Sequence, residues 1–131
     1  MKRRSYLSAM LAGLAGLKAA FAQRAKNPIV LYCDLSVAPA KEQEMLQNFH
    51  TIFKPAAEKF PGYVDLKMLK LRSALQGSAP PSINYRFQLT YESEEARQKW
   101  IHSDIHQKVW PTVENTLANK SSYPVLLFDS V

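Results

Sequence analysis

Two segments of this chain alternate between an apolar and a more polar side, and each is followed by a segment with helical spacing. Residues 83–91 place Ile, Tyr, Phe, Leu and Tyr at odd positions, with Asn, Arg, Gln and Thr between them. Residues 29–37 place Ile, Leu, Cys, Leu and Val at odd positions. A period of two is typical of a strand with one buried face. Because each strand must bury that face, the pattern favours a sheet covered by helices.

The first helical segment is expected to begin at Pro39, a residue tolerated in the first turn of a helix. Apolar residues then recur at spacings of three and four as far as Phe60. They are Met45, Phe49, Ile52, Phe53, Ala56 and Phe60. Pro55 should kink or split this helix because proline lacks an N–H. Pro61 and Gly62 should end it.

The second helix is expected to run from the N-cap Ser93 to Pro111, with Glu94 and Glu95 in its first turn. The Trp110–Pro111 pair should break it. Residues 63–71 and 83–91 read as a hairpin, joined by a loop at 73–82 that is rich in Gly, Ser and Pro. A last strand is expected at 123–130.

This order of elements predicts an α+β fold of the ferredoxin-like βαββαβ type, an antiparallel sheet with two helices on one face. On the first and third strands, the uncovered face would carry Tyr32, Asp34, Arg86 and Gln88, and Asp34 could pair with Arg86. Either water satisfies this face or a second copy of the chain packs on it. The second solution would hide Val30, Val64, Leu66 and Met68. We prefer the homodimer.

Residues 1–22 have the features of an export signal. Lys2, Arg3 and Arg4 precede an apolar stretch at 9–22 that ends in the cleavage pattern Ala-Phe-Ala. The paired arginines resemble a twin-arginine signal, although an ordinary secretory signal is an alternative. The stretch is shorter than the about 20 residues of a membrane span. We therefore expect an exported bacterial protein, periplasmic or secreted, whose mature domain is residues 23–131.

The positive charge of the chain belongs mostly to this N-terminal segment. Removing residues 1–22 takes away four of the 17 basic residues and none of the 11 acidic ones. The remaining sequence is close to neutral and has no basic run, which argues against a nucleic-acid partner. Its single cysteine, Cys33, excludes an internal disulfide and a cysteine-based zinc site.

Any chemistry is expected in residues 91–111, which carry two tryptophans and two histidines. Trp100 and Trp110 are ten positions apart, about 80° around a helix. They could line one side of a cleft, or be core or dimer-contact aromatics. His102 and His106 have a spacing that can place two imidazoles on one metal, but no third ligand is adjacent in sequence, so no metal site is predicted.

Several catalytic classes lack their motifs. The chain has no glycine-rich phosphate loop, no nucleophile elbow and no paired-carboxylate motif. What remains is an aromatic cleft with a few polar groups, suited to a flat, electron-rich molecule.

The sequence resembles the antibiotic biosynthesis monooxygenase (ABM) family of dimeric α/β barrels. The resemblance rests on the order of elements, on the Phe-Pro-Gly-Tyr transition at 60–63, and on Tyr-Glu-Ser-Glu-Glu-Ala at 91–96 leading into Trp-Ile-His-Ser-Asp-Ile-His at 100–106. It implies a ligand cleft between sheet and helices and two sheets packed back to back in a dimer. The family includes cofactor-free oxygenases acting on aromatic polyketides or quinols, and haem-degrading monooxygenases.

The Trp100-x-x-Ser103-Asp104 pattern most resembles the haem-degrading branch. The axial histidine of that branch would fall on Trp110, and its first-strand asparagine would fall on or near Cys33. Because both positions depart from the pattern, we expect no cofactor. Haem ligated by His106, with Trp100 as a wall, is the alternative.

The function predicted from the resemblance is that of a cofactor-independent monooxygenase acting on a flat aromatic or quinol-like substrate. This reaction needs a base that holds the substrate in its deprotonated form, and imidazole titrates in the right range. His106 is the first candidate for this base and His50 the second. The residues predicted to bind substrate are Cys33, Phe49, Tyr85, Phe87, Trp100, Ser103 and Trp110. The alternatives are a dimeric barrel that binds a small aromatic or haem-like ligand without transforming it, and an interaction domain with a filled core.

Overall fold

β1 and β3 pair antiparallel at the centre of a four-stranded sheet with the order β2-β3-β1-β4. The computed structural model describes residues 27–131, so the predicted export signal at 1–22 lies outside the described residues. The strands are β1 (Ile29–Leu35), β2 (Tyr63–Lys70), β3 (Tyr85–Tyr91) and β4 (Val125–Asp129). The helical elements are η1 (Pro39–Lys41), α2 (Glu42–Asn48), η2 (Phe49–Phe53), α3 (Lys54–Glu58), α4 (Glu94–Ile101) and α5 (Asp104–Glu114).

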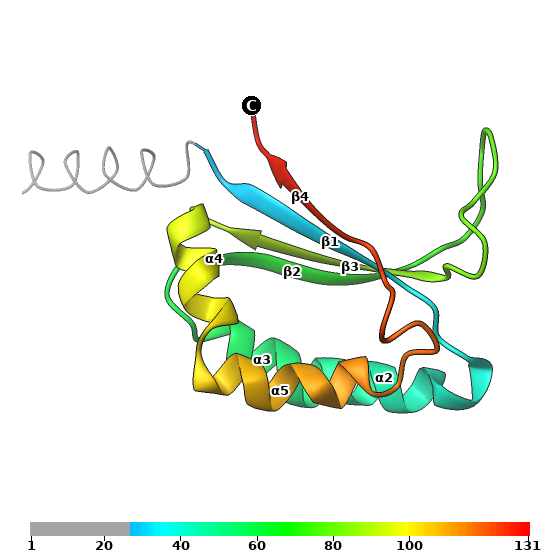
Figure 1. Ribbon diagram of the computed structural model, residues 1–131, viewed down its shortest axis with the longest axis horizontal. Coiled ribbons are helices and arrows are strands. Elements are labelled where there is room, and N and C mark those ends of the chain that lie inside the picture. Colours follow the sequence, from blue (N-terminus) through cyan, green and yellow to red (C-terminus); the bar gives the residue numbers. More distant parts are fainter. Residues whose placement is uncertain (1–26) are drawn as a thin grey trace, which may run out of the picture.

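The helices lie in one layer against one face of this sheet, with α4 at one end of it (Figure 1). All strand pairs are antiparallel. The predicted α+β, ferredoxin-like fold is therefore confirmed. None of the helices within residues 27–131 has the length and apolar character needed to cross a membrane.

The first helical run changes type directly before Pro55, where the sequence predicted a kink or a split. After α2, residues Phe49–Phe53 form a π-helical turn, and Pro55 then occupies the first turn of α3. Proline needs no N–H partner at that position. Phe49 and Phe53 are both fully buried. The wider turn thus places two aromatic rings on the face that covers the sheet.

The second helical run differs from the prediction of a single helix from Ser93 to Pro111. Ser93 caps α4, as expected, by accepting a hydrogen bond from the Ala96 N–H. The helix then ends at Ile101, and α5 begins after Ser103. The Ser103 hydroxyl donates to the Trp100 carbonyl and accepts from the His106 N–H, so one side chain serves both helix ends. Pro111 does not break α5 but lies within it.

A bulge in β2 corrects the prediction for Leu66 and Met68. Tyr63 lies opposite Tyr91, but Asp65 lies opposite Thr90, so the register shifts at Val64. An extra residue in one strand turns all following side chains to the other face. Leu66 is accordingly buried in the core under the helices, and Met68 packs against that core. Val64 is exposed, as expected for an uncovered position.

The uncovered face of the sheet carries an apolar patch on β1 and β4, which we call the β1–β4 patch. It consists of Val30, Tyr32, Leu126 and Phe128, where Val30 lies opposite Phe128 and Tyr32 opposite Leu126. The predicted ion pair between Asp34 and Arg86 borders this patch. Arg86 donates to the Asp34 carboxylate over 2.7 and 3.1 Å. The loop between β2 and β3 extends away from the helical layer on this side (Figure 1).

Candidate functional site

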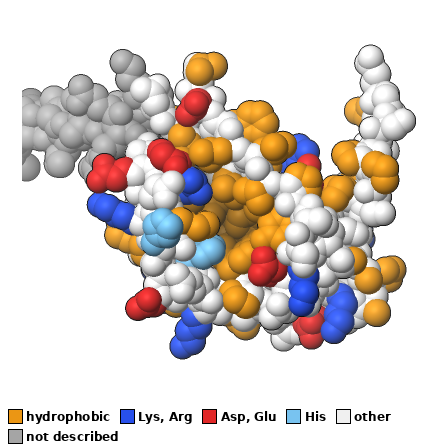
Figure 2. Space-filling view, in the orientation of Figure 1, with side chains coloured by type: hydrophobic (Ala, Val, Ile, Leu, Met, Phe, Trp, Pro, Cys, Tyr) orange, Lys and Arg blue, Asp and Glu red, His pale blue; other side chains and the backbone are white. Residues whose placement is uncertain are grey.

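A cavity of about 90 Å³ lies between the sheet and the helical layer. β1 and β3 contribute Leu31, Cys33, Phe87, Leu89 and Tyr91 to its sheet wall. The helices contribute Phe53, Arg97, Trp100, Ile101, His106 and Trp110, and the C-terminal segment contributes Tyr123 and Val125. In the space-filling view an apolar hollow opens on this face, with histidine side chains beside it (Figure 2).

The helical wall is a set of aromatic rings in edge contact. Phe53 lies at its centre, with ring centroids 5.8 Å from Trp100, 5.4 Å from Trp110 and 5.4 Å from Phe87. Edge-to-face packing at these distances holds each ring in a defined orientation. The cavity is thus an apolar slot whose helical wall is a connected set of aromatic rings.

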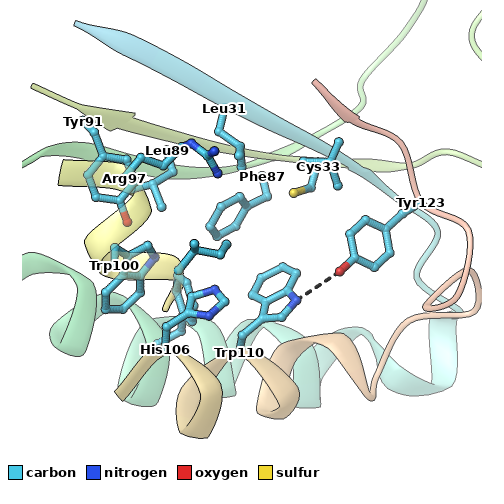
Figure 3. Close-up of a pocket in the computed structure, with 13 residues that line it drawn as sticks. Leu31, Cys33, Phe87, Leu89, Tyr91, Arg97, Trp100, His106, Trp110 and Tyr123 are labelled. Atoms are coloured by element: carbon cyan, nitrogen blue, oxygen red, sulfur yellow. Dashed lines mark hydrogen bonds between the residues drawn. The ribbon is translucent and has the colours of Figure 1, made fainter. Parts of the chain in front are cut away.

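Trp110 is held by a hydrogen-bond network at one end of the cavity. Its indole N–H lies 3.2 Å from a carboxylate oxygen of Glu114 and 3.1 Å from the Tyr123 hydroxyl. The Tyr123 hydroxyl donates to the same carboxylate. Burial and this hydrogen bond raise the pKa of Tyr123, so its phenol stays protonated. These partners orient the Trp110 ring, which faces the cavity (Figure 3).

His106 lies half-buried between the two tryptophans. Its ring centroid is 5.1 Å from that of Trp100, edge to face, and 6.4 Å from that of Trp110, nearly parallel. Burial lowers the pKa of the imidazole below its ordinary value, and the negative charge of Glu114 opposes this shift. His106 is therefore neutral at neutral pH and can accept a proton from a molecule in the cavity.

Cys33 lines the opposite wall as a buried thiol. Burial first, and the carboxylates of Asp34 and Glu114 next, raise its pKa to about 12. A thiol reacts as a nucleophile through its thiolate, which is scarce at such a pKa. Cys33 therefore shapes the cavity as a small apolar side chain.

The structure brings five of the predicted site residues together at this cavity. They are Cys33, Phe87, Trp100, His106 and Trp110. The other four lie elsewhere, for reasons that differ from one residue to the next.

Tyr85 lies on the same face of β3 as Phe87, but it is the first residue of the strand, where its hydroxyl donates to Glu42 over 2.9 Å. Phe49 is buried behind Phe87, with ring centroids 6.1 Å apart. Ser103 caps the two helices instead of facing the cavity. The ring of His50 is exposed and packs on the edge of Phe49.

The cavity also includes residues that were not predicted as site residues, Tyr91, Arg97 and Tyr123 among them. The alternation of β3 already placed Tyr91 on the covered face. Arg97 and Tyr123 carry no comparable signal, because their positions depend on how α4 and the segment before β4 pack.

His102 and His106 do not form a metal pair. His102 ends α4 and is exposed, whereas His106 belongs to α5, on the other side of the helix break. Within residues 27–131, no group of three or more His, Cys, Asp or Glu side chains is placed to hold a metal ion.

The cavity lacks the histidine that the haem-degrading branch would place at the position of Trp110. At the axial position stands Trp110, whose N–H is already bonded to Glu114 and Tyr123.

No protein-family model matches the sequence, and no curated protein matches it either. Solved structures do match the fold. A candidate antibiotic biosynthesis monooxygenase from Caulobacter crescentus CB15 has a TM-score of 0.62 and 20% identity, over 80% of this chain and 91% of that one. A dimeric ferredoxin-like protein of unknown function from Jannaschia sp. CCS1 has a TM-score of 0.61 and 16% identity, over 80% and 98%.

An ethyl tert-butyl ether d (ethd) family protein from Bacillus halodurans C-125 has a TM-score of 0.59 and 12% identity, over 80% of this chain and 99% of that one. At identities this low, the likeness establishes the shared ferredoxin-like fold. These proteins carry different descriptions, so the shared fold does not determine the chemistry of this chain.

Proposed function

We propose that the chain is a cofactor-independent monooxygenase that oxidises a small, electron-rich phenol or quinol bound in the aromatic cavity. The observation that carries this proposal is the neutral, half-buried imidazole of His106 in an apolar slot between Trp100 and Trp110. Aromatic and apolar walls of this kind favour a flat ring, and the imidazole presents a base to it. The resemblance to the ABM family and the fold shared with a candidate ABM protein agree with it.

The proposed reaction begins when His106 takes the phenolic proton. The resulting phenolate is electron-rich and poorly solvated by the apolar walls, so it can transfer an electron to O₂. The two radicals combine at a ring carbon to form a hydroperoxide. Loss of water then leaves a quinone. One oxygen atom ends in the new carbonyl group, and the other leaves as water together with the C–H and O–H hydrogens of the substrate.

The test is oxygen uptake by the purified protein with a panel of phenols and quinols. We expect His106→Phe to reduce turnover about a hundredfold or more, because a positioned base typically contributes that much, while the thermal unfolding midpoint stays near that of the wild type. The matched control is His102→Phe, an exposed histidine at the end of α4. His50→Phe tests the second predicted base, which lies outside the cavity.

The pH dependence of the wild-type rate gives a second readout. Burial lowers the pKa of His106, so the imidazole remains an available base down to a lower pH than an exposed histidine would. The rate should therefore hold at neutral pH and fall as the pH drops through this lowered pKa. Equal turnover in the wild type and His106→Phe would exclude His106 as the base.

The second candidate is a protein that binds the same kind of ligand without transforming it. It is favoured by the sparse polar lining, in which the thiol of Cys33 and the hydroxyl of Tyr123 both stay protonated. A ligand that raises the unfolding midpoint but causes no oxygen uptake in any variant would select this candidate.

We further propose that the chain acts as a homodimer, with the β1–β4 patch of each copy packed against the other sheet. Support comes from the exposed apolar side chains of this patch and from structural neighbours described as dimeric ferredoxin-like proteins. Export by way of residues 1–22, followed by action outside the cytoplasm as the domain 23–131, remains part of the proposal on sequence grounds.

A further inference from the structure

The hydroxyl of Tyr91 is buried at the cavity and has no hydrogen-bond partner among residues 27–131. The residue is only 1% exposed. Its oxygen points toward the space beside Trp100 (Figure 3). Two other tyrosines that pack in or against the core are satisfied, since Tyr85 donates to Glu42 and Tyr123 to Glu114.

An unpaired buried hydroxyl is costly, and nearly all such groups in folded proteins have a partner. The ring of Tyr91 would pack equally well without it, because Phe87 and Leu89 fill the same face of β3 with no polar atom. The hydroxyl therefore adds nothing to the core that phenylalanine would not supply. Because Tyr91 lines the cavity, a molecule bound there can supply the missing partner.

Arg97 adds positive charge to the same end of the cavity. Its guanidinium is fixed by two 2.7 Å hydrogen bonds to the Glu94 carboxylate, and its side chain is 16% exposed. Burial raises the pKa of Tyr91, so the hydroxyl stays protonated and can act as a donor. A protonated, buried donor suits an oxygen that carries partial negative charge.

We propose that the Tyr91 hydroxyl donates a hydrogen bond to a second oxygen of the bound ligand, so that the cavity selects phenols bearing another hydroxyl or carbonyl oxygen. This inference rests on the proposed function, in that the occupant is an aromatic ring whose phenol faces His106. Tyr91 is thus a specificity-determining residue, distinct from the base.

The test compares hydroquinone with 4-methylphenol, which have the same ring and differ in having OH or CH₃ at one position. Binding is measured by calorimetric titration without oxygen, so that affinity is separated from turnover. In the wild type, hydroquinone should bind more tightly. In Tyr91→Phe, the affinity ratio of hydroquinone to 4-methylphenol should fall about five- to tenfold, the worth of one hydrogen bond. The unfolding midpoint of the unliganded variant should stay equal or rise, because an unpaired polar atom is removed.

The matched control is Tyr85→Phe, which removes a hydroxyl from the same face of the same strand, away from the cavity. It should leave the affinity ratio unchanged. If both probes bind and Tyr91→Phe keeps the wild-type ratio, the inference about Tyr91 is overturned while the cavity remains a phenol site. If neither probe binds the wild type, the inference falls together with the proposed substrate class. Binding with the expected affinity ratio but without oxygen uptake would support the inference about Tyr91 and overturn only the proposed monooxygenase activity.

Discussion

Cys33 illustrates how a single residue can lie at a site without taking part in its chemistry. The thiol is buried on the sheet wall, and its pKa is raised to about 12. At pH 8, the thiolate fraction is then on the order of a thousandfold lower than in an unfolded chain, where the ordinary cysteine pKa is about 8.5. The residue fills space between β1 and the aromatic rings and leaves proton transfer to His106.

We predict that iodoacetamide modifies Cys33 of the folded protein at pH 8 on the order of a thousandfold more slowly than Cys33 of the urea-unfolded chain. Intact-mass spectrometry follows the reaction directly, because Cys33 is the single cysteine of the sequence. Labelling of the folded protein at the unfolded rate would contradict the burial of the thiol and would make it a candidate nucleophile.

At the scale of elements, the turn into β2 depends on Gly62. Its φ is +91°, and an added Cβ would lie 2.4 Å from the Cβ of Ala96 in α4. Its carbonyl also accepts the Glu92 N–H at the end of β3. The turn therefore brings β2, β3 and α4 together at the end of the sheet where Tyr91 lies.

We predict that Gly62→Ala lowers the free energy of unfolding by about 3 kcal/mol, from a strained φ and an overpacked contact together. Gly77→Ala is the control, because Gly77 has a φ of +71° but no atom within 4 Å of an added Cβ. It should cost only about 1 kcal/mol, the strain alone. Urea unfolding of the two variants measures the difference, and equal costs would show that the contact with Ala96 relaxes freely.

The elements themselves were largely predictable, since the spacing of apolar residues and the positions of Gly and Pro identify each strand and both helical runs. Their interruptions were not. Ser103 and Pro111 both lie in the second run, and a proline is the stronger breaker by local preference. The helix nevertheless breaks at Ser103, because its hydroxyl satisfies backbone groups of both helices. The bulge at Val64 is equally invisible in the sequence, although it decides which face Leu66 occupies.

At the scale of the whole molecule, the candidate site was predictable only where one element determines it. Trp100, His106 and Trp110 came from one helical run, and Phe87 from one alternating strand. Arg97 and Tyr123 reach the cavity through the packing of separate segments. His50 lies outside the cavity because its ring packs on the edge of Phe49. Tyr85 lies outside it because its position along β3 directs its hydroxyl to Glu42.

The uncovered sheet face should determine whether two molecules of the protein associate. Phe128 is 50% exposed within the β1–β4 patch, where its ring contacts Tyr32 with centroids 5.4 Å apart. Contiguous apolar patches are seldom left in water by monomers. In a two-fold dimer, each substitution in the interface also changes the contact surface of both copies. The ion pair of Asp34 with Arg86, which borders the patch, is already formed within the chain, so its burial would leave neither of these two charges unpaired.

We therefore predict that the wild type is a dimer and that Phe128→Lys converts it to a folded monomer, because two buried lysines would face an apolar surface. Light scattering after size-exclusion chromatography measures the mass, and far-UV circular dichroism checks that the fold is kept. The control is Leu75→Lys, in the loop between β2 and β3, where Leu75 is 97% exposed and away from the sheet face. It should remain a dimer. A Phe128→Lys protein that stays dimeric would place the contact elsewhere, and a loss of dimer in Leu75→Lys alone would assign it to the projecting loop.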